Sequence, residues 1–317
     1  MGLEILLEIR NYNLEIIFMP WLLITLIAYF LNAIAMVVDK TLLKRDVKNP
    51  FVYTFYIAAL GAVLMVFILP FGLRWPGCNQ FIISLIAGAA FTIGLFLMFF
   101  GLKKEDASRL IPVIGGLTPI FVFILAYLFL DERLFSRQAI AFALIIIGTF
   151  IVSLNIGKDH FPHLRRAFWL ALPAAFFFGL SYVLTKDVYN HQSFLSGFIW
   201  TRLGAFVVAM LPMLFAANRR GLLHQGNNAG IANIKGRFLF GQACGGASAI
   251  LIQYAVSMAS VSLVQALQGT QYVFIFIAVV YLTYYYPKIL QEKLSAAIIA
   301  QKIMAIILIG LGMYFII

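Results

Sequence analysis

The sequence predicts an all-α polytopic membrane protein whose ten transmembrane helices form two inverted five-helix repeats. Hydrophobic residues make up 63% of the 317-residue chain and charged residues only 11%, whereas soluble domains carry about 25% charged residues. Apolar runs long enough to cross a membrane recur along the chain, and short connections separate them. The last five runs also resemble the first five in their order of polar and small residues.

The N-terminal segment 1–19 is predicted to lie in the membrane interface as a short amphipathic helix. It contains Glu4, Glu8, Arg10 and Glu15, so it is too polar to span. The same charges leave it without the basic start and apolar stretch of a cleavable signal peptide.

A spanning helix needs about 20 apolar residues. The ten predicted spans are 21–38, 51–73, 81–102, 110–130, 139–154, 168–185, 194–217, 238–258, 261–286 and 294–317. The run 238–286 has 49 residues and would be about 73 Å long as one helix, so it must fold back. Ser257, Ser260 and Ser262 mark the predicted turn. The fourth span contains Pro112, Pro119 and two adjacent glycines, which predict a bending element.

The internal repeat emerges when the chain is aligned with itself. A shift of 146 places Lys40 on Lys186, and a shift of 152 places the pair at 107–108 on the Ala-Ser pair at 259–260. A shift of 160 places Glu132 on Glu292. The shifts grow in order along the chain, as insertions in the second copy would cause. The predicted domains are the interfacial segment 1–19, a first repeat at 20–156 and a second at 167–317.

Each predicted repeat has an odd number of spans, so its partner must insert with the opposite orientation. The odd-numbered loops hold 16 Lys and Arg residues, and the other side of the membrane holds 5, including both termini. The positive-inside rule therefore predicts that both termini lie outside. The net charge of +11 sits largely in these loops, which favours a lipid bilayer as partner and no nucleic acid.

Three motifs around the fourth span resemble the EamA-domain family of the drug/metabolite transporter superfamily. They are Ala107-Ser108 opening the span, Pro119 within it, and Glu132-Arg133-Leu134 after it. Gly148 in the fifth span and Ser181-Tyr182-Val183 in the sixth suit the same pattern. This resemblance implies a membrane transporter built from two EamA-like repeats and placed in a prokaryotic inner membrane.

The second copy departs from the family pattern at two places. Gln271 replaces the proline of the fourth span, and the charged turn comes later, at Glu292. Members of this family usually have both termini in the cytoplasm, which is opposite to the charge count. We follow the resemblance on this point, because basic residues at closely spaced helix ends distort such a count.

Polar side chains inside predicted spans are costly, so each needs a partner, a cavity or water. Gln265, Gln268 and Gln271 follow one face of the ninth span at intervals of three residues. Gln242 and Gln253 lie on the eighth span. We predict that these glutamines line a hydrogen-bonding cavity, with hydrogen bonds between packed helices as the alternative. Asn32 is a further cavity candidate. Trp200, Tyr254 and Tyr272 are candidates as well, although packing against helices or lipid is the favoured interpretation for these aromatic side chains.

Two cations lie about 12 Å inside predicted spans. Arg202 is in the seventh span and Lys302 in the tenth. Arg202 also occupies a position where the family often has an arginine. One interpretation is an anion site, in which arginine grips a carboxylate or phosphate with two parallel bonds. The alternative is that each long side chain reaches the headgroups.

No Asp or Glu lies in the middle of a predicted span, whereas small multidrug pumps of this superfamily use such a carboxylate to exchange protons for cationic drugs. Cys78 and Cys244 are not at metal-ligand spacing, and the four histidines all fall in predicted loops. The sequence therefore predicts no metal site, no cofactor and no catalytic residues.

The resemblance implies a secondary transporter for a small metabolite, possibly an amino acid. Arg202 and the missing mid-span acids favour a polar or anionic one. Transport would follow alternating access through a cavity between the two inverted repeats. A lipid-carrier flippase and a non-transporting membrane sensor are the alternatives. The Gly241–Gly245 pair allows close helix packing within the chain or in a homodimer.

Overall fold

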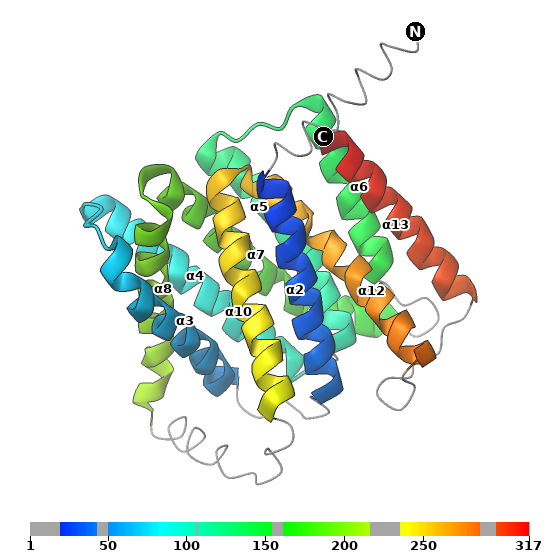
Figure 1. Cartoon of the computed structure of the whole chain (residues 1–317), viewed down its shortest axis with the longest axis horizontal. Coiled ribbons are helices and arrows are strands. Elements are labelled where there is room, and N and C mark those ends of the chain that lie inside the picture. The colour runs from blue at the N-terminus through cyan, green and yellow to red at the C-terminus, as the bar shows by residue number, and fades with distance from the viewer. Residues whose placement is uncertain are drawn as a thin grey trace. The chain divides into compact units, whose positions relative to one another are not determined.

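The computed structural model describes residues 20–42, 50–105, 107–153, 161–215, 235–285 and 296–316. Within these ranges the chain is helical, with one short 3₁₀ segment (Figure 1). The helices are α2 (Pro20–Leu42), α3 (Pro50–Gly72), α4 (Cys78–Leu102), α5 (Ala107–Leu130), α6 (Ser136–Ser153), α7 (Phe161–His191), α8 (Phe194–Met210), η1 (Leu211–Leu214), α10 (Lys235–Met258), α11 (Val261–Ala266), α12 (Gln268–Tyr285) and α13 (Ala296–Ile316). The predicted interfacial helix at 1–19 lies outside the described residues.

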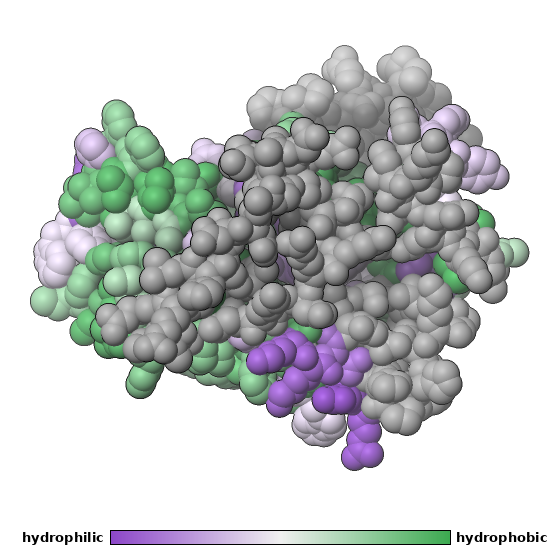
Figure 2. All heavy atoms as spheres, turned by 90° about the horizontal axis from the view of Figure 1, so that it is seen from below, coloured by the Kyte–Doolittle hydropathy of each residue, from purple (hydrophilic) through white to green (hydrophobic). Residues whose placement is uncertain are grey.

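The helices confirm the membrane class. Within the described residues, eight segments are long and apolar enough to cross a bilayer, and α11 and α12 together count as one of them. The apolar stretch Ser136–Val152 in α6 is shorter. Large apolar side chains are exposed, such as Phe67 and Phe71 on α3, which are 72% and 80% exposed. Figure 2 shows such apolar residues over much of the visible described surface, as a lipid-facing surface requires.

The turn within the long run 238–286 falls where the serines predict it. Helix α10 ends at Met258, and α11 begins at Val261. The Ser260 hydroxyl accepts a hydrogen bond of 3.2 Å from the Leu263 amide and so caps α11.

Two helices differ from their predicted form. Helix α7 extends from Phe161 to His191, so it continues beyond the predicted end at Thr185. The predicted span 261–286 is present as Val261–Tyr285, but Leu267 divides it into α11 and α12. In contrast, α5 continues through Pro112 and Pro119 without interruption.

The residue that follows α5 has a left-handed backbone conformation. Asp131 has a φ of +50°, and the Glu132 amide bonds to the Ala126 carbonyl at 3.2 Å. This six-residue closure satisfies a carbonyl that the helix end would leave free. The acidic part of the Glu-Arg-Leu motif therefore belongs to a helix stop.

The chain divides into two compact units that do not coincide with the predicted repeats. Unit 1 contains residues up to Val37, then Arg133–Val152 and Gln242–Ile317. Unit 2 contains Val38–Glu132 and Ser153–Gly241. Unit 1 thus holds α2, α6 and α10 to α13, and unit 2 holds α3, α4, α5, α7 and α8. Both units take helices from both halves of the chain.

Glycines allow very close helix packing in unit 2. A Cβ atom on Gly88 of α4 would lie 2.0 Å from the Thr201 carbonyl oxygen of α8, and one on Gly204 would lie 2.5 Å from the Leu85 oxygen. The Thr92 hydroxyl donates to the Ala205 carbonyl at 2.9 Å across the same pair of helices. The α4 and α8 backbones are therefore in direct contact, a packing typical of membrane helices with small residues at their interface.

In unit 1, α6 and α13 pack side by side through a reciprocal contact (Figure 1). A Cβ atom on Gly148 would lie 2.7 Å from Ile309 and 3.0 Å from the Ala305 oxygen. A Cβ atom on Gly312 would lie 2.5 Å from Ile145 and 2.9 Å from the oxygen of the alanine at 141. Each helix thus carries the same pattern, Ala-x3-Ile-x2-Gly, and each glycine faces the alanine and isoleucine of the other.

Candidate functional site

The first candidate site lies in unit 1 at the junction of α11 and α12, where the predicted glutamine row is interrupted. The Leu267 amide bonds to the Leu263 oxygen at 3.1 Å, and the Thr270 amide bonds to the Leu267 oxygen at 2.9 Å. The Tyr29 hydroxyl of α2 donates to the Val264 oxygen at 3.1 Å. A side chain from another helix therefore supplies a partner beside the interruption, as buried backbone groups in a membrane require.

Asn32 and Gln271, both predicted from the sequence, contact each other in this unit. Asn32 Nδ2 donates to Gln271 Oε1 at 2.9 Å, and Gln271 Nε2 contacts the Met36 sulfur. Gln271 is only 2% exposed. Gln271 therefore forms a hydrogen bond between packed helices, which is the alternative to a cavity that the sequence analysis left open.

The other glutamines have open hydrogen-bonding capacity. Gln265 Nε2 and Gln253 Oε1 are fully buried without a partner among the described residues. Gln242 and Gln268 are half-buried. Gly246 on α10 has open space where a Cβ atom would stand. A buried amide without a partner costs about 1–3 kcal/mol, so these groups favour a site that meets a polar ligand or water.

Lys302 does not stand alone in its span. Its ammonium group donates to the Val152 carbonyl in the last turn of α6, and the neighbouring Gln301 donates to the Ile151 carbonyl. Carbonyls at a helix C-terminus lack intrahelical partners and attract positive charge. Lys302 on α13 therefore caps the C-terminus of α6 and links the two helices.

We expect the Asn32–Gln271 pair to contribute measurably to stability. Asn32→Leu should lower the free energy of unfolding by about 1–3 kcal/mol, because Gln271 would keep a buried oxygen without a donor. The double variant Asn32→Leu, Gln271→Leu should lose less than the sum of the single variants. Thermal unfolding in detergent measures both, and additive losses would contradict the pairing.

The second candidate site lies in unit 2 and centres on Arg202 in the middle of α8. The guanidinium carbon lies 5.4 Å from the Phe91 ring centre and 5.0 Å from the Phe198 ring centre. Gly61 on α3 makes room for the stem, since a Cβ atom there would lie 3.3 Å from Arg202 Cδ. Arg202 Nε is fully buried without a partner, and no described residue forms an ion pair with Arg202.

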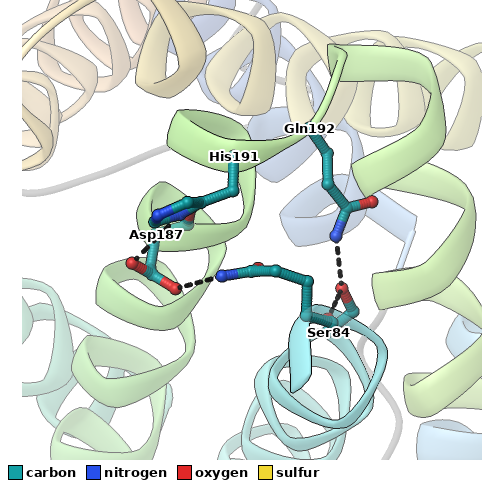
Figure 3. A network of polar contacts seen from close by, with 5 residues as sticks. Ser84, Asp187, His191 and Gln192 are labelled. Atoms are coloured by element: carbon teal, nitrogen blue, oxygen red, sulfur yellow. Dashed lines mark hydrogen bonds and ion pairs between the residues drawn. The ribbon is translucent and has the colours of Figure 1, made fainter. Parts of the chain in front are cut away.

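A polar network at the end of α7 ties unit 2 together (Figure 3). Gln80 Nε2 donates to Asp187 at 3.2 Å, and Gln192 Nε2 donates to the Ser84 hydroxyl at 3.2 Å. His191 Nδ1 lies 3.5 Å from the Asp187 carboxylate. The network joins α4 to the end of α7 and the start of α8.

Trp200, which the sequence analysis offered as a cavity residue, belongs to an adjoining cluster. Its indole nitrogen donates to the Arg74 carbonyl at 2.9 Å, and its ring meets Trp75 and Phe81 edge-on at 5.8 and 5.2 Å. Its contacts are therefore those of helix packing. Of the other aromatic candidates, Tyr254 is 41% exposed, and Tyr272 is buried with Val152 and Ala305.

Sequence reasoning missed Tyr29 and Tyr189. Tyr29 precedes Asn32 by three residues, so it shares that helix face, and this spacing was a usable signal. Tyr189 fell outside the predicted sixth span, and no sequence signal marked it. Its ring is buried, and its hydroxyl is enclosed without a partner among the described residues.

Comparison with known proteins finds a family match for the first part of the chain and a fold match for most of it. No curated protein sequence matches the chain. A solved structure titled only "Crystal structure of protein" is similar over 92% of this chain and 94% of that chain, with a TM-score of 0.62 and 16% identity. That likeness concerns the fold. The model of the EamA-like transporter family matches residues 19–154. This match identifies residues 19–154 as an EamA-like transporter domain, and the apolar helices of the described residues indicate an integral membrane protein.

Proposed function

We propose that this protein is a secondary transporter that moves a small polar or anionic metabolite across a prokaryotic inner membrane. Transport would proceed by alternating access between two inverted repeats at 20–156 and 167–317. The family match supports transport as the general activity. The substrate class and the mechanism are the proposal, and Arg202 is the observation that carries it.

Two features support the inverted repeat. The reciprocal α6–α13 contact pairs the fifth predicted span with the tenth through identical Ala-x3-Ile-x2-Gly patterns, which is how a local two-fold axis would relate them. Unit 2 contains spans three, four and six, and unit 1 contains their proposed repeat partners eight, nine and one; spans two and seven share unit 2, and spans five and ten share unit 1. This division of three of the five pairs is compatible with a two-fold relation between the repeats.

Arg202 supports an anionic substrate. Its charge lies within a span, its Nε atom is fully buried, and no described carboxylate neutralises it. A charge removed from water costs several kcal/mol unless a counter-charge compensates, and ionisable groups inside membranes usually mark substrate pathways. Contact with Phe91 and Phe198 offsets part of that cost. A substrate anion would supply the remaining compensation.

The interrupted helix at 266–268 supports a polar substrate. Secondary transporters typically place their binding sites at discontinuous spans. Here Gln265 and Gln253 bring buried amide groups without partners to the same unit, and we propose that Asn32, Gln268 and Gln242 complete the hydrogen-bonding wall. Lys302 is expected to act through its contact with α6.

Transport in reconstituted vesicles tests the proposal. A panel of labelled organic anions and uncharged metabolites would identify a transported compound. Arg202→Gln should then reduce anion transport at least about tenfold, since one charge-assisted hydrogen bond is worth about 1.5–3 kcal/mol. Lys302→Gln serves as the matched control, because it removes the other in-span cation. Undiminished anion transport by Arg202→Gln would contradict the anion assignment.

A further inference from the structure

We propose that Tyr189 and Arg202 form one binding site for the carboxylate of a monoanionic substrate. This inference rests on the proposed function, because it specifies the anion that Arg202 would hold. It adds a second ligand-binding residue, and it selects carboxylate over phosphate.

Tyr189 has a fixed ring and a hydroxyl without a partner. The side chain lies in the last turn of α7 and is 8% exposed. Its ring packs against Gly197 of α8, where a Cβ atom would lie 2.9 Å from it, and it meets the Phe194 ring at 5.4 Å between centres. The hydroxyl is fully enclosed, and no described residue bonds to it. A buried hydroxyl normally has a partner, so its orphan state favours a ligand.

The guanidinium of Arg202 extends toward the same end of α8. Side chains on a helix lean toward its N-terminus, and the 5.0 Å approach to Phe198, one turn earlier, shows that Arg202 does so. Gly197 and Phe194, the residues that hold Tyr189, also lie on this N-terminal side. The Phe198 ring, which Arg202 contacts, lies 5.9 Å between centres from the Phe194 ring, which Tyr189 contacts.

The two orphan groups are both hydrogen-bond donors. Arginine has five N–H donors and no acceptor, and the tyrosine hydroxyl can donate one bond. A carboxylate presents two acceptor oxygens, so one oxygen could bond to Arg202 and the other to Tyr189. Each buried protein group would then gain the hydrogen bond that it lacks without a ligand.

The local charge favours a monoanion. The described acids near these helices have other partners: Asp187 accepts from Gln80 and faces His191, and Glu132 interacts with Lys186. One arginine therefore faces the site with one uncompensated positive charge. A single carboxylate balances it, whereas a phosphate monoester would bring nearly two negative charges and leave one of them without a counter-charge in a low-dielectric site.

Binding of benzoate tests this site directly. Benzamide is the uncharged isostere, and phenyl phosphate is the dianionic counterpart. Benzoate should raise the melting temperature of the purified protein in detergent, because a ligand of the folded state stabilises it, and the other two compounds should do so much less. A long-chain saturated fatty acid is tested in the same way, to determine whether the site binds the carboxylate of a lipid or that of a soluble compound.

Substitutions of Tyr189 and Arg202 test whether each residue donates a hydrogen bond to the bound carboxylate. Tyr189→Phe should weaken benzoate binding about tenfold or more, and Arg202→Gln should reduce it further. Tyr127→Phe is the control, since Tyr127 lies in the same unit but is 53% exposed; its affinity for benzoate should equal that of the parent protein. Gel filtration and circular dichroism confirm that each variant is folded.

The outcomes separate this inference from the proposed function. Equal affinity in Tyr189→Phe overturns the role of Tyr189, and tighter binding of phenyl phosphate than of benzoate overturns the monoanion. Binding of the fatty acid alone overturns a soluble substrate for this site. If another anion is transported in an Arg202-dependent way while benzoate fails to bind, the proposed function stands and the carboxylate site is wrong.

Discussion

Gly88→Ala should destabilise the protein more than any other single methyl addition considered for unit 2. The new Cβ atom would lie 2.0 Å from the Thr201 oxygen and 2.5 Å from the Ala205 nitrogen, both of which are backbone atoms. Since a helix backbone cannot move aside as a side chain can, α4 and α8 would have to separate. Overpacking of this kind costs about 1–3 kcal/mol or more, which exceeds the gain of about 1 kcal/mol that alanine brings to a helix.

Gly246→Ala is the control for this experiment. Nothing lies within 4 Å of the Cβ position on Gly246, so only the helix-propensity gain applies there. Unfolding in detergent should therefore show opposite signs for the two substitutions, with Gly88→Ala less stable and Gly246→Ala as stable as the parent protein or more so. Equal stability of the two variants would mean that the α4–α8 backbone contact is not formed.

Gly148→Ala and Gly312→Ala should destabilise the protein by similar amounts, because the two glycines make equivalent contacts. Their Cβ atoms would lie 2.7 and 2.5 Å from the facing isoleucine side chains, and 3.0 and 2.9 Å from the facing alanine oxygens. Each substitution should cost about 1–3 kcal/mol. Either one forces α6 and α13 apart, so the double variant should lose less than the sum of both.

Gly310→Ala on α13 is the matched control for this pair, since nothing lies within 4 Å of its Cβ position. It should leave the free energy of unfolding unchanged or raise it slightly. A large difference between Gly148→Ala and Gly312→Ala would contradict the reciprocal contact. Additive losses in the double variant would mean that the two glycines act at independent places.

Features that depend on local composition could be predicted from the sequence. The apolar runs gave the membrane class and most span positions, because a bilayer imposes one length and one polarity on every helix. Ser260 marked the turn before α11 because a serine at that position can cap the helix. Asn32 and Gln271 were both selected as polar residues inside spans, and the structure pairs them.

Features that depend on distant partners could not be predicted. The sixth span was predicted to end at Thr185 because Lys186 and Asp187 interrupt the apolar pattern. Glu132, which follows α5, and Gln80 on α4 interact with these charges, and α7 continues. The same shortened span concealed Tyr189. Lys302 had the sequence context of a site residue, and its partner is a carbonyl 150 residues earlier.

The interruption between α11 and α12 is of the same kind. Neither proline nor an adjacent pair of glycines marks it. Tyr29, which is 235 residues away, bonds to the Val264 oxygen, and the Thr149 hydroxyl fills the space beside Gly269, where a Cβ atom would lie 2.1 Å from it. The roles of Arg202 and the glutamines in substrate binding stay predictions, which the vesicle experiments address.

The division of the chain between two units has a consequence for biosynthesis. Helix α2 leaves the ribosome before the other described helices, yet it belongs to unit 1, which also contains α10 to α13, the described helices that are made latest. The bond from Tyr29 to Val264 can form only after more than two hundred further residues have been synthesised. During that interval α2 lies in the bilayer without its contacts to α11, and the hydrogen bonds within the helix satisfy its backbone groups. Unit 2 lacks only α7 and α8 when the first repeat is finished, so it can assemble earlier, and unit 1 is the last part of the protein to mature.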